Sequence, residues 1–452
     1  MKKTILFADY GFVILALLLF SQALMILFLT GGASQGDGTE TQSSYPLIQF
    51  AFSIIFVLTT FKLLTFWKQA TDILIKEKFI LLFLAVAFVS ILWSETQTIT
   101  GRRAVAITGT TLFGVYFGIR YNIKQQLTLL AWTFGIAILL SFVFALTFPA
   151  YGIMGGPIHA GTWRGIYAHK NTLGGAMTTS LLVFLLLASS GKHSLNSRPF
   201  VYLGLGLSIV LLILSTSKAA LLNAAIILAS LATYSLWRRL YNVLAPTMIA
   251  LVLTAGCLLL DIKAIPIVLP HAISPPPAIQ STFADGSSPP AEPILFSVDT
   301  FKTLTGRTDL WLILVDKIKQ QPWLGFGYDS FWRSGANSPS NDVLATIRNW
   351  SPVHAHNGFL DLWLSLGLLG ISIFILSILR VFRQLIARRH HKAEVEHLWP
   401  GLYILYFILL NLTESSLARP NHIYWVMYVA VVCSATAVTY GYVDDIFEPH
   451  AK

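Results

Sequence analysis

Two histidines stand one residue apart in the run Val353-His354-Ala355-His356-Asn357, just ahead of a long apolar segment. Asparagine is a favoured N-cap residue, so we expect a helix to begin directly after Asn357. His356 would then lie beside the positive end of that helix, where an imidazole tends to stay neutral and can act as a general base near neutral pH. A surface histidine with a structural hydrogen bond is the alternative.

The same two histidines could bind a metal ion, because an HxH pair presents two imidazoles together. The neighbouring sequence offers no clear third histidine or carboxylate. We therefore predict no metal ion and no cofactor at this site.

A second motif is Thr305-Gly306-Arg307-Thr308-Asp309-Leu310-Trp311, which precedes an amphipathic stretch. Asp309 and Thr308 suit the first turn of a helix. Arg307 would add a planar fork of donors to the free backbone N–H groups there, a combination that suits phosphate or diphosphate. The alternative is an ion pair between Arg307 and a loop carboxylate such as Asp299 or Asp329.

Two further runs carry cations next to small or hydroxylated residues. Lys218 follows Ser215-Thr216-Ser217 and could bind phosphate as a point charge. The run Trp163–Asn171 contains Arg164 and Lys170, and glycines that allow close backbone approach follow it. The alternatives are an ordinary snorkelling lysine and a membrane-interface loop anchored by aromatic residues.

The remaining candidates are aromatic and acidic. The run Pro322–Trp332 contains Tyr328 among other aromatic residues and glycines, a composition suited to stacking on sugar rings and equally to lying flat on a bilayer. Glu414 ends an apolar segment, and an ionisable residue at membrane depth is a functional candidate. Pairing of Glu414 with Arg419 is the alternative.

Composition shows what kind of protein must position these residues. The chain has 452 residues, of which 55% are hydrophobic and 12% charged, against roughly 45–50% apolar and about 25% charged in an average soluble domain. This excludes an ordinary soluble enzyme and a disordered chain. The net charge of +10 is typical of cations in cytoplasmic loops, so we expect no nucleic-acid partner.

We predict an all-α polytopic integral membrane protein with about twelve transmembrane helices. Lys2 and Lys3 precede an apolar run that reaches Thr30, which is longer than a signal-peptide core and indicates a retained first span. The predicted spans are 10–30, 47–67, 79–94, 102–119, 127–148, 171–190, 199–215, 219–237, 243–260, 357–379, 399–414 and 421–442.

Cations concentrate on the side of this arrangement that holds both termini, which the positive-inside rule makes cytoplasmic. Six cations fall on the opposite face and need a reason: Arg102, Arg103, Arg164, Lys170, Lys218 and Arg419. The reason is either headgroup contact or an anionic ligand on that face.

Three regions follow from this topology. Residues 1–260 would form transmembrane helices 1–9, and residues 357–452 would form helices 10–12. Between them lies one large periplasmic loop, 261–356, with a Pro/Ser-rich spacer at 261–295 and a catalytic part with helices at 296–356. All the motifs share the outer face. A histidine base, several cations and an aromatic platform together describe glycosyl transfer from a lipid diphosphate.

The spacing His356-Asn357, nine residues, Gly367-x-x-Gly370 resembles the signature of the bacterial O-antigen ligase/polymerase superfamily. The SxSK, RGxxxHKNxxG, GRTxxW and GFGYxxFW segments are similar to its exopolysaccharide polymerase branch, in the expected order across residues 163–370. Residues 1–150 match only as generic spans.

The resemblance implies a GT-C-like inner-membrane enzyme that needs no metal and takes a glycan from undecaprenyl diphosphate at the periplasmic face. His356 would be the catalytic histidine and Arg307 the diphosphate-binding arginine. Lys218 stands where the family often has a second arginine, a departure that removes the bidentate fork. Lys170, Arg164, His354, Asn357, Asp309, Tyr328 and Glu414 are the other predicted binding residues.

We expect an inverting polysaccharide polymerase, which passes the glycan to another lipid-linked unit. An O-antigen ligase, which passes it to lipid A core, is the closest alternative. Membrane lipids and other polysaccharide assembly proteins are expected partners. A non-catalytic lipid-linked glycan flippase or exporter is the alternative of another class, and it should hold its charged residues near the bilayer midplane instead.

Overall fold

A computed structural model of the chain describes residues 2–23, 46–155, 159–190, 198–236, 307–332, 339–341, 343, 352–387 and 398–440. Within these ranges the regular elements are helices, and one isolated β-bridge pairs Ile153 with Trp163. They are α1 (Lys2–Phe20), α3 (Pro46–Leu64), α4 (Trp67–Lys76), α5 (Lys78–Val89), the 3₁₀ turn η1 (Ser90–Leu92), α6 (Gln97–Arg120), α7 (Ile123–Thr147), α8 (Pro149–Gly152), α9 (Lys170–Ser190), α10 (Arg198–Leu214), α11 (Lys218–Leu236), α14 (Arg307–Gln320), α16 (Gly358–Ala387), α17 (Trp399–Thr413) and α18 (Ile423–Thr439).

Four of these helices, α3, α7, α9 and α16, are long and apolar enough to cross a membrane. Shorter apolar helices accompany them, including α10, α17 and α18. The all-helical, apolar architecture is that of a membrane protein. The count of about twelve spans stays a prediction, and its segment 243–260 lies outside the described residues, as does the spacer 261–295.

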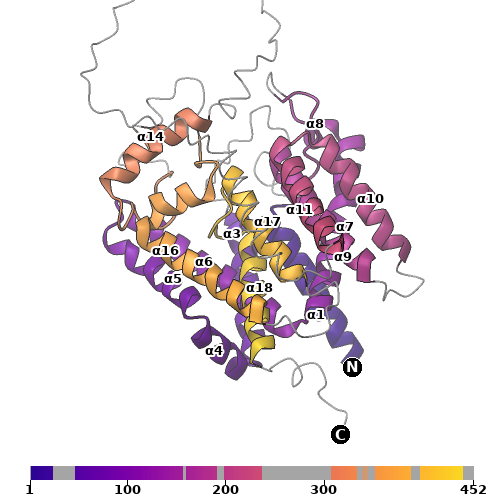
Figure 1. Cartoon of the computed structure of the whole chain (residues 1–452), viewed down its shortest axis with the longest axis horizontal. Coiled ribbons are helices and arrows are strands. Elements are labelled where there is room, and N and C mark those ends of the chain that lie inside the picture. The colour runs from indigo at the N-terminus through magenta and orange to yellow at the C-terminus, as the bar shows by residue number, and fades with distance from the viewer. Residues whose placement is uncertain are drawn as a thin grey trace, which may run out of the picture.

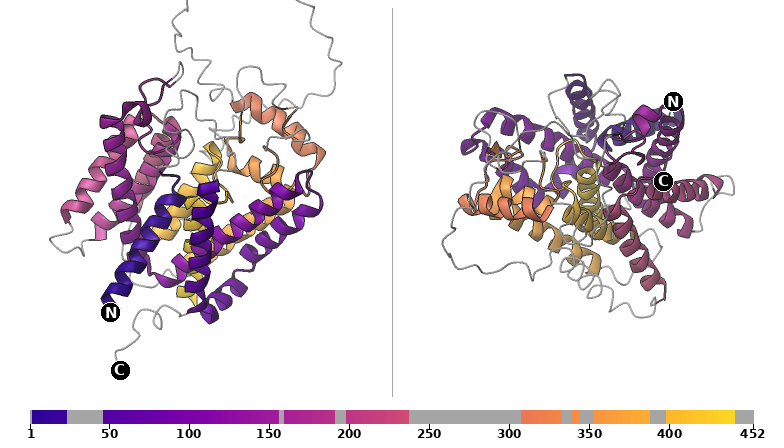
Figure 2. Two further views of the ribbon diagram at one scale, coloured as in Figure 1. Left: turned by 180° about the vertical axis from the view of Figure 1, so that it is seen from behind. Right: turned by 90° about the horizontal axis from the view of Figure 1, so that it is seen from above.

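Helices α17 and α18 form the centre of the bundle, between a group containing α5, α6 and α16 and a group containing α7, α9, α10 and α11 (Figures 1 and 2). Every residue of α18 from Ile423 to Ala437 is buried. Gly114 and Gly118 of α6 make this possible, because a Cβ on Gly118 would lie 2.6 Å from the carbonyl oxygen of Ala430. Small residues four apart let two membrane helices pack backbone to backbone.

Two carboxylates, Asp9 and Glu77, are buried within the bundle and are satisfied by donors from other helices. Asp9 accepts hydrogen bonds from Lys62, Tyr116 and Tyr121, and Glu77 accepts from Arg380, Gln384 and Thr436. Because their donors come from separate helices, these carboxylates fix helix packing. The start of α1 and helix α4 lie at the end of the bundle opposite α14 (Figure 1).

The first helix differs from its predicted span of 10–30. It already begins at Lys2 and ends at Phe20. The Ser21 hydroxyl donates to the carbonyl oxygen of Leu18 at 2.7 Å, and Gln22 adopts a left-handed backbone with φ of 67°. A side-chain cap followed by a left-handed residue ends a helix whatever the hydropathy of the next residues. Residues 24–30 lie outside the described ranges.

Helix α16 is broken at Gly367, where the sequence predicted an uninterrupted span at 357–379. Gly367 has φ of 62° and ψ of −163°, which no helix residue adopts. The segment Pro322–Gly327 lies against the break. The N–H groups of Phe326 and Gly327 donate to the carbonyls of Leu364 and Ser365 at 2.8 and 3.0 Å.

The N–H groups on the far side of the break are satisfied by the same segment. Those of Leu368 and Leu369 donate to the carbonyls of Pro322 and Trp323 at 2.8 and 3.2 Å. The segment 322–327 therefore replaces the helix bonds that the break removes, so the backbone groups freed by the break stay hydrogen-bonded. Gly367, the first glycine of the GxxG pair, allows the segment 322–327 to approach this closely, because a Cβ on Gly367 would lie 2.2 Å from the Trp323 backbone.

Replacing Gly367 with alanine should destabilise the protein by about 3 kcal/mol or more, because the change combines a left-handed backbone with a backbone clash. Thermal unfolding in detergent would measure the loss. The matched control is Gly206→Ala in α10, where nothing lies within 4 Å of the added methyl group and stability should hold or rise. Equal unfolding temperatures for the two variants would contradict the role of the break.

Candidate active site

The start of α16 is fixed by Asn357, as the sequence predicted. Its Oδ1 accepts hydrogen bonds from the N–H groups of Phe359 and Leu360 at 3.0 and 3.2 Å. The side chain is 5% exposed. The N-cap prediction is confirmed, and the cap anchors the two histidines that precede it.

The peptide groups on both sides of Ala355 are held by hydrogen bonds from Trp311 of α14 and to Asp361, which also accepts from Trp332. The Trp311 indole donates to the Ala355 carbonyl at 2.7 Å, and the Ala355 N–H donates to Asp361 at 3.0 Å. The Trp332 indole donates to the same Asp361 oxygen at 2.7 Å. Because Ala355 is fully buried between the two histidines, this clamp sets the positions of both.

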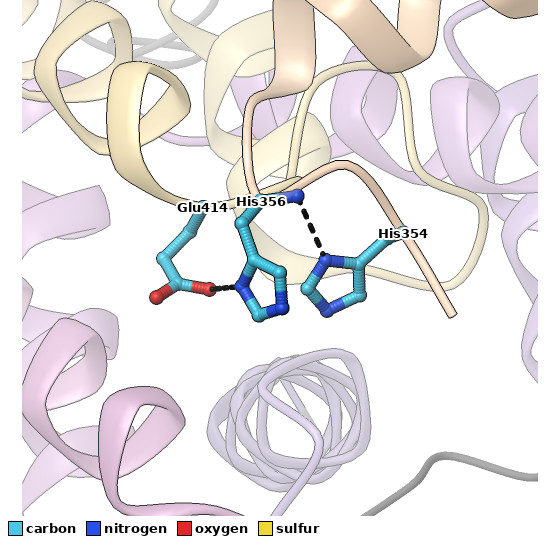
Figure 3. A group of neighbouring side chains, drawn as sticks. All are labelled: His354, His356 and Glu414. Carbon is cyan, nitrogen blue, oxygen red and sulfur yellow. Dashed lines mark hydrogen bonds and ion pairs between the residues drawn. The ribbon is translucent and has the colours of Figure 1, made fainter. Parts of the chain in front are cut away.

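His354 and His356 lie against each other with ring centroids 4.0 Å apart. Nδ1 of His354 accepts the backbone N–H of His356 at 3.2 Å. Nδ1 of His356 lies 3.6 Å from Oε2 of Glu414, within ion-pair distance (Figure 3). The backbone of His356 is left-handed, with φ of 50°, and this turns its ring toward Glu414 and beside His354.

Glu414, which directly follows α17, links the histidine pair to α14 and to α9. Arg307, the first residue of α14, donates to Glu414 Oε1 at 3.2 Å and to the carbonyl oxygen of Thr413 at 2.6 Å. Asn171, in the first turn of α9, donates to the same Oε1 at 2.9 Å. Arg307, His356, Asn171 and Glu414, together with His354, are called the Glu414 cluster below.

Arg307 pairs with a carboxylate other than the two that the sequence offered for it. Its ion pair is with Glu414, whereas Asp329 pairs with Arg103 at 3.3 Å. Asp299 lies outside the described residues. The sequence missed this pairing because Glu414 follows a different helix, far along the chain from Arg307.

The charge states in the cluster follow from burial and neighbours. Burial by itself would raise the pKa of Glu414, but His356 and Arg307 outweigh it and hold that pKa well below its ordinary value. Burial, followed by the charges of His356 and Arg419, holds the pKa of His354 well below its ordinary value. At neutral pH Glu414 is therefore ionised and His354 is neutral. A neutral His354 whose Nδ1 accepts a hydrogen bond carries its proton on Nε2.

Lys170 and the Ser215–Lys218 turn meet beside the cluster. Lys170 is the first residue of α9, one position before Asn171, and its Nζ lies 3.5 Å from the Thr216 hydroxyl. The turn packs on α9 so closely that a Cβ on Gly174 would lie 2.8 Å from the Ser217 side chain. Lys218, the first residue of α11, follows directly from this turn.

Arg164 and Tyr328 have structural partners. Arg164 is 1% exposed and donates to the carbonyls of Tyr151 and Ala150 in α8, at 2.8 and 3.2 Å. Tyr328 is 2% exposed and donates to the Ala418 carbonyl at 2.5 Å. Arg164 thus ties its loop to α8, and Tyr328 ties one loop to another. The described bonds of Arg164 do not reach the Glu414 cluster. The side chain of Asp309 lies outside the described residues.

The aromatic run 322–332 is divided between two environments. Phe326 and Phe331 are buried with Tyr328, while Trp323 is 69% exposed. The run is therefore not a flat platform of the kind that the sequence suggested. Its glycines bring the backbone against the break in α16. Trp323 is exposed, whereas the Trp332 indole donates to Asp361.

A third potential metal ligand, absent from the neighbouring sequence, is supplied by Glu414. Ligand atoms of His354, His356 and Glu414 lie within 4.8 Å of one another. The Arg307 guanidinium already shares Glu414, and a divalent cation there would be repelled by that fixed positive charge. The arrangement suits proton transfer and anion binding better than metal binding.

Four positioning residues lay inside motifs that the sequence singled out without giving them a role: Asn171, Trp311, Trp332 and Asp361. The available signal was chemical. A buried indole N–H needs an acceptor, but the sequence did not indicate that Trp311 would find the Ala355 carbonyl and Trp332 the Asp361 carboxylate.

Residues 203–375 match the family model described as O-antigen ligase. A comparison with curated proteins gives no match. The matched segment contains Lys218, Arg307, His354 and His356, whereas Asn171 and Glu414 of the cluster lie outside it. The match confirms the resemblance to the O-antigen ligase/polymerase superfamily.

Proposed function

We propose that this membrane protein is an inverting, metal-independent glycosyltransferase that moves a glycan from undecaprenyl diphosphate to an acceptor sugar. The observation that carries the proposal is the Glu414 cluster, which joins an imidazole, a carboxylate and a guanidinium from separate elements. Its membrane setting and the O-antigen ligase match imply a lipid-linked glycan donor and an acceptor in general terms.

In the proposed reaction His356 is the base. Glu414 orients His356 through Nδ1, which leaves Nε2 to take the proton of the acceptor hydroxyl. The hydroxyl oxygen bonds to the anomeric carbon as the bond from that carbon to the diphosphate oxygen breaks, so the configuration inverts. The electron pair leaves on the diphosphate, and the proton on His356 is then lost to water.

The developing negative charge would be met by cations on one side of the cluster. Arg307 uses Nη1 and Nη2 for Thr413 and Glu414, so the held guanidinium is already oriented before substrate arrives. Lys170 and Lys218 start neighbouring helices, whose N-termini favour anions. Preorganised donors of this kind are each worth about a hundredfold to a thousandfold in rate.

We place the enzyme in the bacterial inner membrane with the cluster facing the periplasm and both termini in the cytoplasm. Support comes from the loop charges and from the position of α14 opposite α4 and the start of α1 (Figure 1). The candidate residues lie at the ends of helices and not in their middles. A flippase or exporter would hold them near the bilayer midplane, so this grouping argues against that function.

Polymerase is the preferred activity and ligase the second candidate. Lys218 in place of the arginine of ligases and the GRTDLW segment favour a polymerase of the exopolysaccharide or O-antigen type. The description of the matched family favours a ligase.

Deletion in the native host, with surface glycan and lipopolysaccharide sized on gels, would test both. For a polymerase we expect loss of long polymer while single repeat units still reach lipid A core. Loss of all glycan on core, with long lipid-linked chains accumulating, would mean a ligase. Unchanged glycans on both would overturn the proposed function.

A further inference from the structure

A cavity of about 60 Å³ lies beside His354. That volume holds several water molecules or the hydroxylated edge of a larger ligand. Its lining comes from three separate segments of the chain and includes Phe331, Trp332, Asp361, Ser365, Ser415 and Arg419. Neither Arg307 nor Glu414 is among its lining residues, so His354 is the residue that the cavity shares with the Glu414 cluster.

The lining has the chemistry of a sugar site. Two aromatic rings offer apolar faces, while carboxylate, hydroxyl and guanidinium groups offer hydrogen bonds in both directions. A lipid tail is disfavoured, because it would bury Asp361 and Arg419 against hydrocarbon. A diphosphate is disfavoured because Arg419 lines the cavity together with the carboxylates of Asp361 and Asp329, so the lining carries no net positive charge.

The two imidazoles are complementary toward a single hydroxyl group. His354 accepts through Nδ1 and therefore presents an Nε2–H donor. His356 is oriented by Glu414 through Nδ1 and presents an Nε2 acceptor. The remaining nitrogens of both rings lie on the same side of the pair (Figure 3).

We propose that this cavity is the acceptor subsite: it holds the hydroxylated edge of a sugar ring, and the reacting hydroxyl extends past His354 to lie between the Nε2 atoms of His354 and His356. His354 donates a hydrogen bond to that oxygen, and His356 removes its proton as the oxygen bonds to the anomeric carbon and the diphosphate leaves. The inference rests on the proposed function and adds to it the place of the acceptor, in a cavity that Arg307 does not line.

The first test fills the cavity with Val353→Trp. Val353 lines the cavity and lies outside the clamp on Ala355. The donor probe is the lipid-diphosphate-linked repeat unit extracted from host membranes, and the acceptor probe is the same oligosaccharide freed from its lipid by mild acid. We expect the KM for the free oligosaccharide to rise about tenfold or more, with the KM for the lipid-linked donor unchanged.

The matched control is Leu312→Trp, which introduces the same tryptophan side chain on the exposed face of α14 and should leave both KM values unchanged. An unchanged oligosaccharide KM in Val353→Trp, or an equal rise in both KM values, overturns the acceptor subsite while the proposed function stands. Failure of the wild-type protein to transfer any glycan overturns the proposed function itself.

Two substitutions of His354 test its part without filling the cavity. In His354→Asn the side-chain oxygen can still accept the N–H of His356, but nothing replaces Nε2–H. In His354→Gln the amide reaches the Nε2 position and can still donate. We expect His354→Gln to retain about tenfold more activity than His354→Asn. The reverse order would show that His354 acts only by holding the backbone of His356, and would overturn its contact with the acceptor.

Discussion

Replacing His356 with alanine is expected to lower the rate of glycan transfer about a thousandfold, the usual contribution of a positioned general base. The loss should appear in the rate at saturating substrate, because the Arg307 and cavity contacts that bind substrate remain. The measurement is transfer in detergent or proteoliposomes with extracted lipid-linked repeat unit. Full product formation by the variant would show that His356 is not the base.

A second variant guards against a trivial loss of folding. His356 has a left-handed backbone, which asparagine tolerates better than alanine. His356→Asn should therefore fold like the wild type and be equally inactive. The matched control is His391→Ala, a histidine that follows α16 in the sequence and belongs to none of the proposed motifs. That variant should transfer glycan at the wild-type rate.

Replacing Arg307 with alanine is expected to lower transfer by about a hundredfold to a thousandfold, because a preorganised donor to the departing diphosphate is lost. The transfer rate of Arg307→Lys should lie between those of Arg307→Ala and the wild type. Lysine keeps the charge but loses the guanidinium fork that reaches both Thr413 and Glu414. Inhibition by added undecaprenyl diphosphate, the product, should weaken in parallel.

The control for Arg307 is Arg102→Ala, at an exposed arginine near the start of α6 that contacts Gln49. It removes the same charge and should leave both transfer and product inhibition unchanged. If Arg307→Ala were inhibited by undecaprenyl diphosphate as strongly as the wild type, Arg307 would not contact the diphosphate.

Much of the fold follows from local patterns. Long apolar runs gave the helices, and Asn357 gave the start of α16, because hydropathy and capping depend on residues close together in the chain. The ends of α1 and the break at Gly367 did not follow. The break depends on a remote segment at Trp323, whereas α1 ends at a local cap, the Ser21 hydroxyl on the Leu18 carbonyl, inside a continuous apolar run.

The candidate site shows the same division. The sequence identified His356, Arg307 and Glu414 as candidate site residues, each within its own motif. Their joining at one carboxylate was not, because nothing in a linear pattern places the end of α17 beside the starts of α9 and α14. For Arg164 the sequence could not separate a buried arginine bonded to α8 from a ligand-binding arginine, because the two look alike in a linear pattern.

The exchange of backbone hydrogen bonds at Gly367 also determines how this protein could be recombined with its relatives. The segment Pro322–Gly327 and the first half of α16 complete each other's backbone, so neither is a separable module. A chimera that imports a foreign loop alone would keep the break in α16 but lose the segment 322–327 that hydrogen-bonds to it. The smallest transferable unit runs from Pro322 through Gly370, and it brings the histidine pair with it.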